Sequence, residues 1–562
     1  MLTTDYDEGP LREQTMSTIL ENRATRFGSD PFVQYGPESR TISFRELDDT
    51  ANSIANALGA LGIETGDHVS VMVRDPLRTL FAMCGINTAG AVYSPINYDY
   101  SGEPLRYQLD DTDPSVLVVE DRYLERLAAI EDDLECSPRL VVYRSGEATV
   151  DEQPSIGPDD ATDFADMLTA DTAPPDVSLS WDDEASIVYT SGTTGRPKGV
   201  VLPYRWIFAN YAGKRTAFLS PEDTMHTSLP LYHVAGLYWD VTAALIAGAS
   251  VSLWDRFSAT DFWDRIDRYD ATTVTLLSVM IPWLDDRSPS AADRHNTLNK
   301  VHMQPLPENY GELAQRYGFD FITVGFGQTE CGGPFGALVH AARGDDATPP
   351  EYRRGLDTQD VIDAAERVGL PVVSEVPGDR YMGKPRTEIM EATVLDENDE
   401  QLPPGEVGEL AVRPQLPGLI LDRYLGKPEE TVRAFRNLWF HTGDAVYRDE
   451  ADNFYFVDRI GDVIRRRGEN ISSVQIQDAI NSHDDVAQAA VFPVSAPEGG
   501  EDQIGAAVVV ENDLSRGTLE AFLDDQLPSF MTPDRLQLVA DLPTTETNKI
   551  EKYKLRERFL ED

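Results

Sequence analysis

The chain has 562 residues, 41% of them hydrophobic and 26% charged, which is typical of a large globular protein with several domain-sized units. Its formal net charge of −49 opposes general binding to nucleic acid or to anionic lipid. The apolar stretches are too short to span a membrane, and the acidic N-terminal segment is unlike a signal peptide. We therefore expect a soluble, cytoplasmic protein without nucleic-acid partners or membrane spans.

Lysine is scarce in this sequence. It accounts for only eight of the 48 basic residues, and the other 40 are arginine. An acidic, lysine-poor surface is tolerated where molar salt shortens the Debye length to about 3 Å. The composition therefore indicates a halophilic protein, with an acidic mesophilic protein as the alternative. Three widely spaced cysteines and eight histidines without a ligand pattern predict neither a disulfide framework nor a built-in metal site.

Helical and strand patterns alternate in the first part of the chain. Ser43, followed three residues later by Glu46, predicts a capping box at the start of a helix. The predicted helices are residues 44–61, 76–88 and 105–109, and the predicted strands are residues 68–73, 91–93 and 115–119. Such alternation predicts an α/β fold with largely parallel sheets.

The pattern changes toward the C-terminus. The predicted elements there are strands at 405–413 and 453–457, a helix at 474–480, strands at 487–492 and 504–510, a helix at 519–527, and a basic tail. A boundary after Asp458 fits this change. We predict a large N-terminal domain of layered α/β subdomains over residues 1–458 and a small C-terminal α+β domain over residues 459–562.

The most informative segment is IVYTSGTTGRPKGV at residues 187–200, where a short strand runs into a loop of small residues. Glycines let backbone N–H groups approach an anion, hydroxyls add donors, and Lys198 adds a positive charge. Pro197 before that lysine excludes a Walker A loop. We predict a phosphate-binding loop, with a surface turn as the alternative. Its residues are Thr190, Ser191, Gly192, Thr193, Thr194, Gly195 and Lys198.

With this string the chain resembles the adenylate-forming (AMP-binding) superfamily, specifically its acyl-CoA synthetases, and the resemblance covers nearly the whole chain. Further motifs follow in the family's order. They are FGQTE at residues 326–330, WFHTGD at 439–444, DRIGDVIRRRGENIS at 458–472, and Lys549 near the C-terminus. The hinge position is Gly461, an arrangement similar to that of carnitine-type and very-long-chain acyl-CoA ligases.

The resemblance implies a role for each motif. Phe326, with Gly327 and Gln328, would bind adenine, Thr329 would contact the α-phosphate, and Glu330 would support Mg²⁺. Asp444 and Arg459 would hold the ribose, and Gly468 would lie beside the pantetheine arm of CoA. The catalytic residues that it implies are Lys549, Thr193, Lys198 and Glu330.

The acyl-substrate pocket departs from the family pattern. The resemblance assigns His233, Gly236, Gln304 and Gly325 to this pocket. Family members commonly carry Gly-Gly-Ala-Pro-Leu where this chain reads HMQPL at residues 302–306, so the identity of the acid is left open. Residues 340–380 resemble an insertion, either a lid or a surface loop.

The activity implied by the resemblance is that of an acid–thiol ligase. Such an enzyme joins a small-molecule carboxylic acid to ATP, giving an acyl-adenylate and pyrophosphate, and then transfers the acyl group to coenzyme A, releasing AMP. The implied cofactors are ATP, Mg²⁺ and coenzyme A, and the C-terminal domain would be mobile between the two steps. Fatty acids, within fatty acid metabolism, and aryl or carnitine-like acids all fit the motifs. A stand-alone enzyme that loads a carrier protein, a non-catalytic nucleotide-binding protein and a homodimeric assembly stay open.

Overall fold

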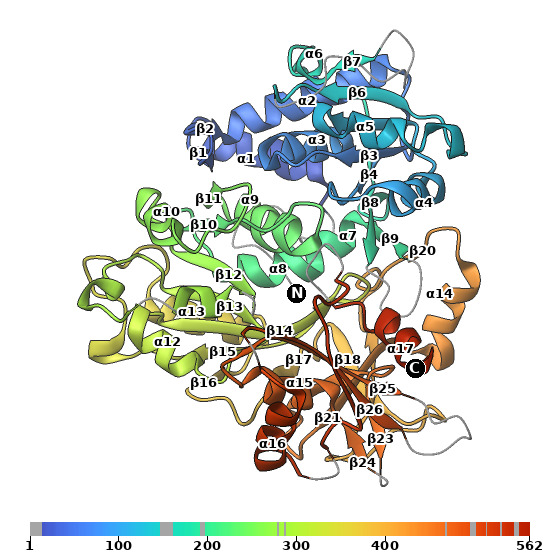
Figure 1. Cartoon of the computed structure of the whole chain (residues 1–562). Coiled ribbons are helices and arrows are strands. Elements are labelled where there is room, and N and C mark those ends of the chain that lie inside the picture. Colours follow the sequence, from blue (N-terminus) through green and yellow to red (C-terminus); the bar gives the residue numbers. More distant parts are fainter. Residues whose placement is uncertain are drawn as a thin grey trace. The chain divides into compact units, whose positions relative to one another are not determined.

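The computed structural model describes residues 14–146, 161–190, 197–277, 280–285, 288–466, 469–494, 502–512, 514–528, 531–544 and 550–561. They belong to two compact units. The first unit holds the described residues up to 190, residues 198–391 and residues 414–433. The second unit holds residues 392–413 and the described residues from 434 onward. Figure 1 shows both units in colours that follow the sequence.

One sheet of the first unit has the strand order β20-β9-β8-β4-β3-β5-β6-β7. Its strands from β8 to β7 pair in parallel, whereas β8 and β9 form an antiparallel hairpin. The predicted strands at 68–73, 91–93 and 115–119 are confirmed as β3, β4 and β5. The bounds are β3 (His68–Met72), β4 (Val92–Pro95), β5 (Val116–Glu120), β6 (Arg139–Tyr143), β7 (Thr162–Asp163), β8 (Glu184–Thr190), β9 (Lys198–Pro203) and β20 (Arg423–Tyr424).

Two of the three helices predicted in this region, those at 44–61 and 76–88, begin where the sequence predicts. In α2 (Phe44–Ala60) the Ser43 hydroxyl accepts the N–H of Glu46 at 3.1 Å, but the Glu46 side chain pairs with Arg40 at 2.9 Å. Only half of the predicted capping box therefore forms. Helix α3 (Pro76–Thr88) matches its predicted range, because Asp75 caps it and proline opens its first turn. Helix α4 (Gly102–Thr112) extends the helix predicted at 105–109.

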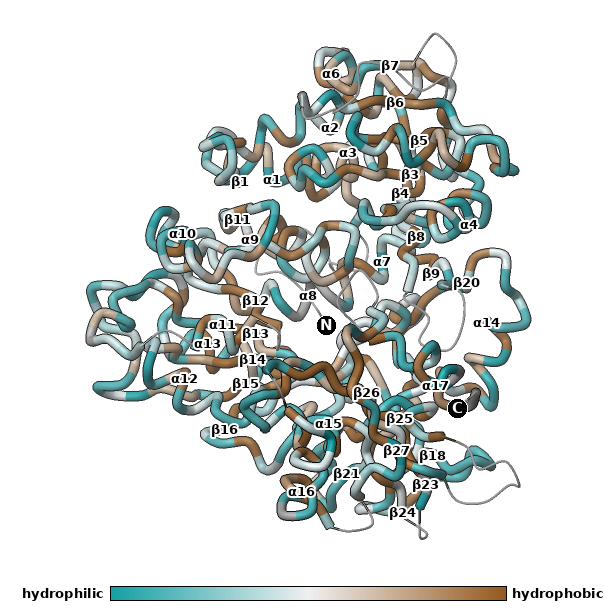
Figure 2. The backbone as a smooth tube through the Cα atoms, in the orientation of Figure 1, coloured by the Kyte–Doolittle hydropathy of each residue, from teal (hydrophilic) through white to brown (hydrophobic). Residues whose placement is uncertain are grey.

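A second sheet of the first unit follows the order β2-β1-β11-β10-β12-β13-β14-β15-β17, with β16 beside β15. Neighbours from β1 to β14 pair in parallel, and β14 and β15 are antiparallel. Many of these strands are brown in Figure 2, as expected for strands buried on both faces. The bounds are β1 (Pro31–Tyr35), β2 (Arg40–Ser43), β10 (Thr224–Thr227), β11 (Ser250–Leu253), β12 (Thr273–Leu277), β13 (Lys300–Gln304), β14 (Phe321–Gln328), β15 (Gly332–His340), β16 (Val372–Val373) and β17 (Tyr381–Pro385).

The first unit contains several further helices. Two segments that contact strands of the second sheet have π-helical hydrogen bonding, η4 (Ile207–Ala212) and η5 (Ala235–Thr242), a geometry that is frequent at functional sites. The α-helices are α1 (Met16–Phe27), α7 (Tyr204–Trp206), α8 (Gly213–Thr216), α9 (Ala243–Ala247), α10 (Phe262–Arg268), α11 (Ile281–Asp285), α12 (Tyr310–Tyr317) and α14 (Pro428–Ala434).

Residues 340–380 are an integral part of the first unit. They include α13 (Thr358–Arg367), whose Val361 and Ala364 pack in a core cluster with Phe321 and Leu338. Arg353 also pairs with the buried Asp320 at 2.8 Å. This segment therefore shares a packed core with strands β14 and β15, which neither a loose surface loop nor a detached lid would do.

Within its described residues the second unit contains three groups of paired strands and three α-helices. The strand orders are β18-β19-β21-β22, β23-β24 and β25-β26-β27. The strands are β18 (Met390–Leu395), β19 (Gly408–Pro414), β21 (Phe440–Arg448), β22 (Phe454–Arg459), β23 (Ile464–Arg466), β24 (Glu469–Ile471), β25 (Val486–Val494), β26 (Gln503–Val510) and β27 (Arg535–Leu538), and the helices are α15 (Ser473–Asn481), α16 (Arg516–Gln526) and α17 (Lys552–Glu561). The elements predicted for this region are confirmed, and the basic tail forms α17. The boundary after Asp458 stays a prediction.

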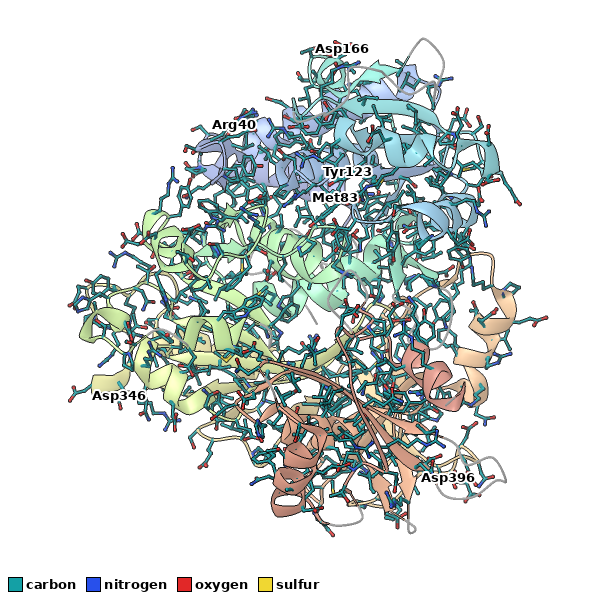
Figure 3. All side chains as sticks on the ribbon, viewed as in Figure 1. Arg40, Met83, Tyr123, Asp166, Asp346 and Asp396 are labelled. Carbon is teal, nitrogen blue, oxygen red and sulfur yellow. The ribbon has the colours of Figure 1, made fainter. Side chains whose placement is uncertain are left out.

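Acidic side chains cover the surface while apolar ones fill the layers. Figure 3 labels Met83 and Tyr123, which are buried, and Asp166 and Asp346, which are exposed. Within the described part of the chain, no helix is both long and apolar enough to cross a membrane.

Candidate functional site

The predicted phosphate loop joins the two strands of the β8–β9 hairpin. Thr190 ends β8, Lys198 begins β9, and the two are paired in the register of the hairpin. The backbone hydrogen bonds between β8 and β9 therefore fix the positions of Thr190 and Lys198. The other predicted loop residues lie outside the described residues; they are Ser191, Gly192, Thr193, Thr194 and Gly195.

Tyr424 connects Lys198 to Glu330. Strand β20 pairs with β9 and places Tyr424 so that the Lys198 ammonium lies 4.2 Å from the centroid of its ring. The Tyr424 hydroxyl donates a hydrogen bond to Glu330 Oε1 at 3.2 Å. Burial, together with the Glu330 carboxylate, raises the pKa of Tyr424, so the hydroxyl stays protonated and can donate. Sequence reasoning missed Tyr424, because only the pairing of β20 with β9 reveals it.

The predicted adenine motif ends strand β14. Phe326 is buried and packs edge-to-face on Phe335, with ring centroids 6.0 Å apart. Gln328 ends the strand, and Thr329 and Glu330 form the turn into β15. The backbone N–H of Leu421 donates to the Glu330 carbonyl at 2.7 Å, which fixes that turn beside β20.

A cavity of about 160 Å³ opens where strands β12, β13 and β14 end. Such carboxyl ends of parallel strands are common ligand sites in α/β proteins. Alternate residues of a strand point to one face, so β12 and β13 each contribute every second residue, whereas β14 contributes three residues in succession. Helix η5 adds Ala235 and Trp239, and Phe326 and Gly333 complete the wall. The strand residues are Thr275 and Leu277, His302 and Gln304, and Gly325 and Gly327.

A chain of hydrogen bonds runs along the cavity wall. His302 Nδ1 lies 3.0 Å from Thr323 Oγ1, and His302 Nε2 lies 3.2 Å from Gln304 Oε1. Trp239 packs on His302 with ring centroids 5.0 Å apart, and Thr275 donates to the buried Asp240 at 2.7 Å. The side chains that border the cavity are therefore held by their neighbours.

The four predicted pocket residues divide into two pairs. Gln304 and Gly325 line the cavity, whereas His233 and Gly236 are not among its lining residues. His233 packs against the Tyr232 ring at 4.7 Å between centroids. A Cβ at Gly236 would lie 2.9 Å from the carbonyl oxygen of Leu229, so this glycine permits a close backbone approach at the start of η5. Sequence reasoning missed Ala235, Trp239, Thr275 and Leu277 as lining residues, because their convergence depends on strand order.

In the second unit, Asp444 and Arg459 face each other across strands β21 and β22. They are register partners, and Arg459 Nε lies 3.0 Å from Asp444 Oδ1. Asp444 is fully buried, whereas the Arg459 side chain is 41% exposed. The preceding Gly443 has a φ of +73°, which glycine adopts without strain, and its N–H donates to Glu409 Oε1 at 3.0 Å.

His441 and Arg436 stabilise the ionised carboxylate of Glu409. Its Oε2 lies 3.0 Å from His441 Nδ1 and 2.7 Å from an Arg436 nitrogen. Burial alone would raise the pKa of Glu409, but His441 and Arg436 hold that pKa below its usual value. The carboxylate therefore stays ionised and supports the Thr442-Gly443-Asp444 segment of β21.

Asp458 connects strand β22 to the rest of the second unit. Its carboxylate accepts the N–H of Arg459 and that of Ser473, each at 2.7 Å. Ser473 opens helix α15 and also accepts a hydrogen bond from Lys552 of α17 at 2.7 Å. The remaining predicted residues of this part, Gly468 and Lys549, lie outside the described residues.

Comparison with known proteins identifies the family. The AMP-binding enzyme pattern matches residues 20–418, and the pattern of the AMP-binding enzyme C-terminal domain matches residues 475–549. The chain belongs to the AMP-binding enzyme family. The predicted family, the prediction of an enzyme, and the α/β fold with a small C-terminal domain are confirmed.

Relatives of this AMP-binding enzyme extend over nearly its whole length. A crotonobetaine/carnitine–CoA ligase of Salmonella enteritidis is 29% identical, and the match covers 92% of this chain and 93% of the relative. ATP-bound MatB from Rhodopseudomonas palustris has a TM-score of 0.76 at 23% identity, covering 97% of this chain and 99% of that one. The AMP complex of o-succinylbenzoate coenzyme A synthetase from Bacillus subtilis has a TM-score of 0.76 at 21% identity, covering 97% and 98%. These two structures share the fold of this AMP-binding enzyme.

Glu330 suits a magnesium ion that is held mainly by nucleotide oxygens. Among the described residues, no group of three or more His, Cys, Asp or Glu side chains could enclose a metal ion. One oxygen of Glu330 accepts from Tyr424, and the carboxylate sits at the end of β14. Mg²⁺ is commonly bound by one or two carboxylates together with phosphate oxygens and water. The donor set of this AMP-binding enzyme therefore fits Mg²⁺ bound together with a nucleotide.

Proposed function

We propose that this AMP-binding enzyme is an ATP-dependent carboxylate–CoA ligase. A carboxylate oxygen attacks the α-phosphorus of ATP, and pyrophosphate leaves with the electron pair of the broken P–O bond. The CoA sulfur then attacks the acyl carbonyl carbon, and AMP leaves. The observation that carries this proposal is the cavity wall, which continues from Gly325 and Gly327 directly into the turn that bears Glu330.

Positive charge is the main requirement of the first step. Both the carboxylate and the phosphate are anionic, so their approach and the charge of the transition state must be offset by preorganised cations. Lys198, held on the Tyr424 ring, supplies one of these charges. By resemblance, Lys549 supplies a second charge, and Thr190 to Gly195 supply backbone and hydroxyl donors to the phosphates.

Magnesium belongs to the proposal as a nucleotide-bound ion. Glu330 would hold it, and Tyr424 keeps the Glu330 carboxylate oriented. When bound, Mg²⁺ neutralises phosphate charge. By resemblance, Phe326, Gly327, Gln328 and Thr329 bind the adenine and the α-phosphate.

The second unit supplies the ribose contacts and the second step in this proposal. Asp444 accepts from the ribose hydroxyls, and the exposed guanidinium of Arg459 lies beside it. Residues 459–562 act as the mobile domain, which presents Lys549 during adenylation and the Gly468 region to CoA during thioester formation. The halophilic character and cytoplasmic location predicted from composition stay predictions.

Acid-dependent release of pyrophosphate, with stoichiometric formation of AMP and loss of free CoA thiol, tests this function. Release of pyrophosphate without thiol consumption would instead favour a carrier-protein-loading enzyme. Nucleotide binding without pyrophosphate release, across acids that are short, long, aryl and charged, would contradict the ligase proposal and favour a non-catalytic nucleotide-binding protein.

A further inference from the structure

The acyl cavity has a size, a charge and a polarity that restrict its substrate. Resting on the ligase function proposed above, we infer that the substrate is a monocarboxylic acid whose acyl group is small, uncharged and about as large as a benzene ring. Long-chain, dicarboxylic and quaternary-ammonium acids are excluded. Trp239 and Gln304 are the residues that determine this specificity.

The size of the cavity carries the first part of the inference. Its volume is about 160 Å³, and a cavity of about 150 Å³ in another protein holds a benzene molecule. Of its lining residues, Trp239 packs on His302, and the buried Arg215 lies 5.7 Å from the centroid of the Trp239 ring. A longer acyl chain would have to displace these packed side chains.

The shape of the cavity comes from three glycines. Gly325 and Gly327 lie on β14, and Gly333 is the second residue of β15. Without side chains, this wall consists of backbone. The opposite wall is the Trp239 side chain of η5, together with Ala235. A backbone wall facing an indole ring suits a flat or slender acyl group.

The second part of the inference, that the acyl group is uncharged, rests on the charges around the cavity. Among the described residues, its lining includes no Asp, Glu, Lys or Arg side chain. Two buried charges contact lining residues and are opposite in sign: Asp240 accepts from Thr275, and Arg215 lies over the Trp239 ring. Asp223 is the other acidic residue that interacts electrostatically with Arg215, and it forms an ion pair with Lys300 at 2.6 Å. A cationic or anionic acyl group would therefore find no counter-charge, and burying an unpaired charge is costly.

Gln304 gives the cavity its polar contact. Gln304 Oε1 can only accept, so His302 Nε2 donates to it, and His302 Nδ1 lies 3.0 Å from the Thr323 hydroxyl oxygen. Gln304 makes no other hydrogen bond within the described residues, so its amide N–H₂ is the donor left for the cavity. An uncharged acceptor on the acyl group, such as a hydroxyl or carbonyl oxygen, can accept from it.

A panel of acids tests the inference in the full-length enzyme with ATP, Mg²⁺ and CoA. Benzoate, 4-hydroxybenzoate, palmitate, malonate and carnitine are compared by kcat/KM for AMP formation. We expect one of the two benzoates to exceed the last three acids by about 100-fold or more. If palmitate, malonate or carnitine is the best substrate, the ligase function stands and the inferred substrate class is wrong. If no acid yields AMP, the ligase proposal falls, and this inference falls with it.

Variants at the two ends of the cavity give a second test. Trp239→Ala should raise the ratio of kcat/KM for octanoate to that for benzoate by about tenfold or more. The control is Trp283→Ala, whose side chain is 52% exposed, and it should leave that ratio unchanged. If Trp239→Ala does not fold, Gly325→Val replaces it and should lower kcat/KM for benzoate by about tenfold while sparing acetate. An unchanged preference in a folded variant of either kind would overturn the inference.

The role of Gln304 is tested with a shape-conserving change. Gln304→Met keeps the length of the side chain and removes its amide donor. The ratio of kcat/KM for 4-hydroxybenzoate to that for benzoate should fall by about fivefold or more, because a good hydrogen bond to the substrate is lost. The same ratio in wild type and variant would show that Gln304 does not contact the acyl group.

Discussion

The Lys198 ammonium lies 4.2 Å from the centroid of the Tyr424 ring. A cation over an aromatic face gains about 0.5–2 kcal/mol, depending on how far it is desolvated. The hydroxyl of the same ring donates to Glu330, so one side chain positions a cation with its face and a carboxylate with its edge. Tyr424 is therefore a positioning residue for two groups that we propose to act on ATP.

Substitutions of Tyr424 should separate these two effects. Tyr424→Phe keeps the ring and removes the hydroxyl, so Glu330 loses one partner and the Mg²⁺ concentration needed for half-maximal rate should rise severalfold. Tyr424→Leu also removes the ring beneath Lys198, and kcat for pyrophosphate release should fall further, by about tenfold beyond the Phe variant. Both quantities are measured by acid-dependent pyrophosphate release at several Mg²⁺ concentrations.

Tyr455 provides the matched control for this pair. It is also buried, and its hydroxyl donates to Asp449 at 3.0 Å in the second unit. Tyr455→Phe removes a comparable tyrosine–carboxylate hydrogen bond and should leave the Mg²⁺ dependence unchanged. Equal Mg²⁺ dependence in the Tyr424 and Tyr455 variants would mean that the Tyr424 hydroxyl does not orient Glu330.

Lys549 should matter for only one half-reaction. We expect Lys549→Ala to lower the rate of acyl-adenylate formation by about 10² to 10³, because one preorganised charged donor is lost. Thioester formation from a supplied acyl-adenylate should be largely spared. The control is Lys554→Ala, which removes a lysine that is 45% exposed and paired only locally with Glu551. Equal loss in both half-reactions would contradict the two-conformation mechanism.

Local sequence signals were sufficient to predict those helices whose ends are marked by capping residues. Asp75 and Pro76 fix the start of α3, and this helix matches its predicted range at both ends. Strands β12 to β14 lacked such signals, since buried parallel strands are short apolar runs that resemble buried helices. Their order alone brings Thr275, His302 and Gly325 to one cavity, so most of the acyl site could not be predicted.

The motif residues were predicted for a different reason. Lys198 and Glu330 belong to strings that resemble a family, and resemblance assigns a role without describing the contacts that support it. Tyr424 supports both residues but lies far from them in the sequence, and it reaches them only through the pairing of β20 with β9. A single sequence carries no signal for such a pairing.

Asp240 should make stability depend on pH. Burial raises its pKa to about 6, although Arg215 and the Thr275 hydroxyl oppose this shift. Because the folded-state pKa lies above the usual value of 3.8, the folded protein binds the proton more tightly. The contribution of this group to stability is therefore full below about pH 4 and is lost as pH rises through about 6, a change of about 3 kcal/mol.

The variant Asp240→Asn should remove this dependence, since an amide does not titrate in this range. Unfolding by denaturant is measured at pH 4.5 and pH 7 for both proteins. The wild type should lose stability relative to the variant as pH rises. Asp166→Asn, at an exposed position, should follow the wild type. A stability difference between wild type and Asp240→Asn that is constant with pH would show that Asp240 has an ordinary pKa.

Salt should stabilise the protein, because 97 acidic residues face only 48 basic ones. Exposed carboxylates such as Asp166 and Asp346 point away from the packed layers (Figure 3). At 0.01 M salt the Debye length is about 30 Å, so such carboxylates repel one another over long distances, whereas at 1 M it is about 3 Å. The repulsion that opposes the compact state should therefore largely vanish in molar KCl.

Low salt should also weaken ATP binding, since the nucleotide brings further negative charge to an acidic protein. In the proposed function, Lys198, Arg459 and Mg²⁺ would oppose this effect only near the phosphates and the ribose. Melting temperature and the rate of pyrophosphate release should rise together between roughly 0.1 and 3 M KCl, because the Debye length is about 10 Å at 0.1 M and already about 3 Å at 1 M. If both stay flat or fall over that range, the halophilic interpretation is wrong. The ligase proposal would then stand, because it rests on the motifs and the cavity and not on the net charge.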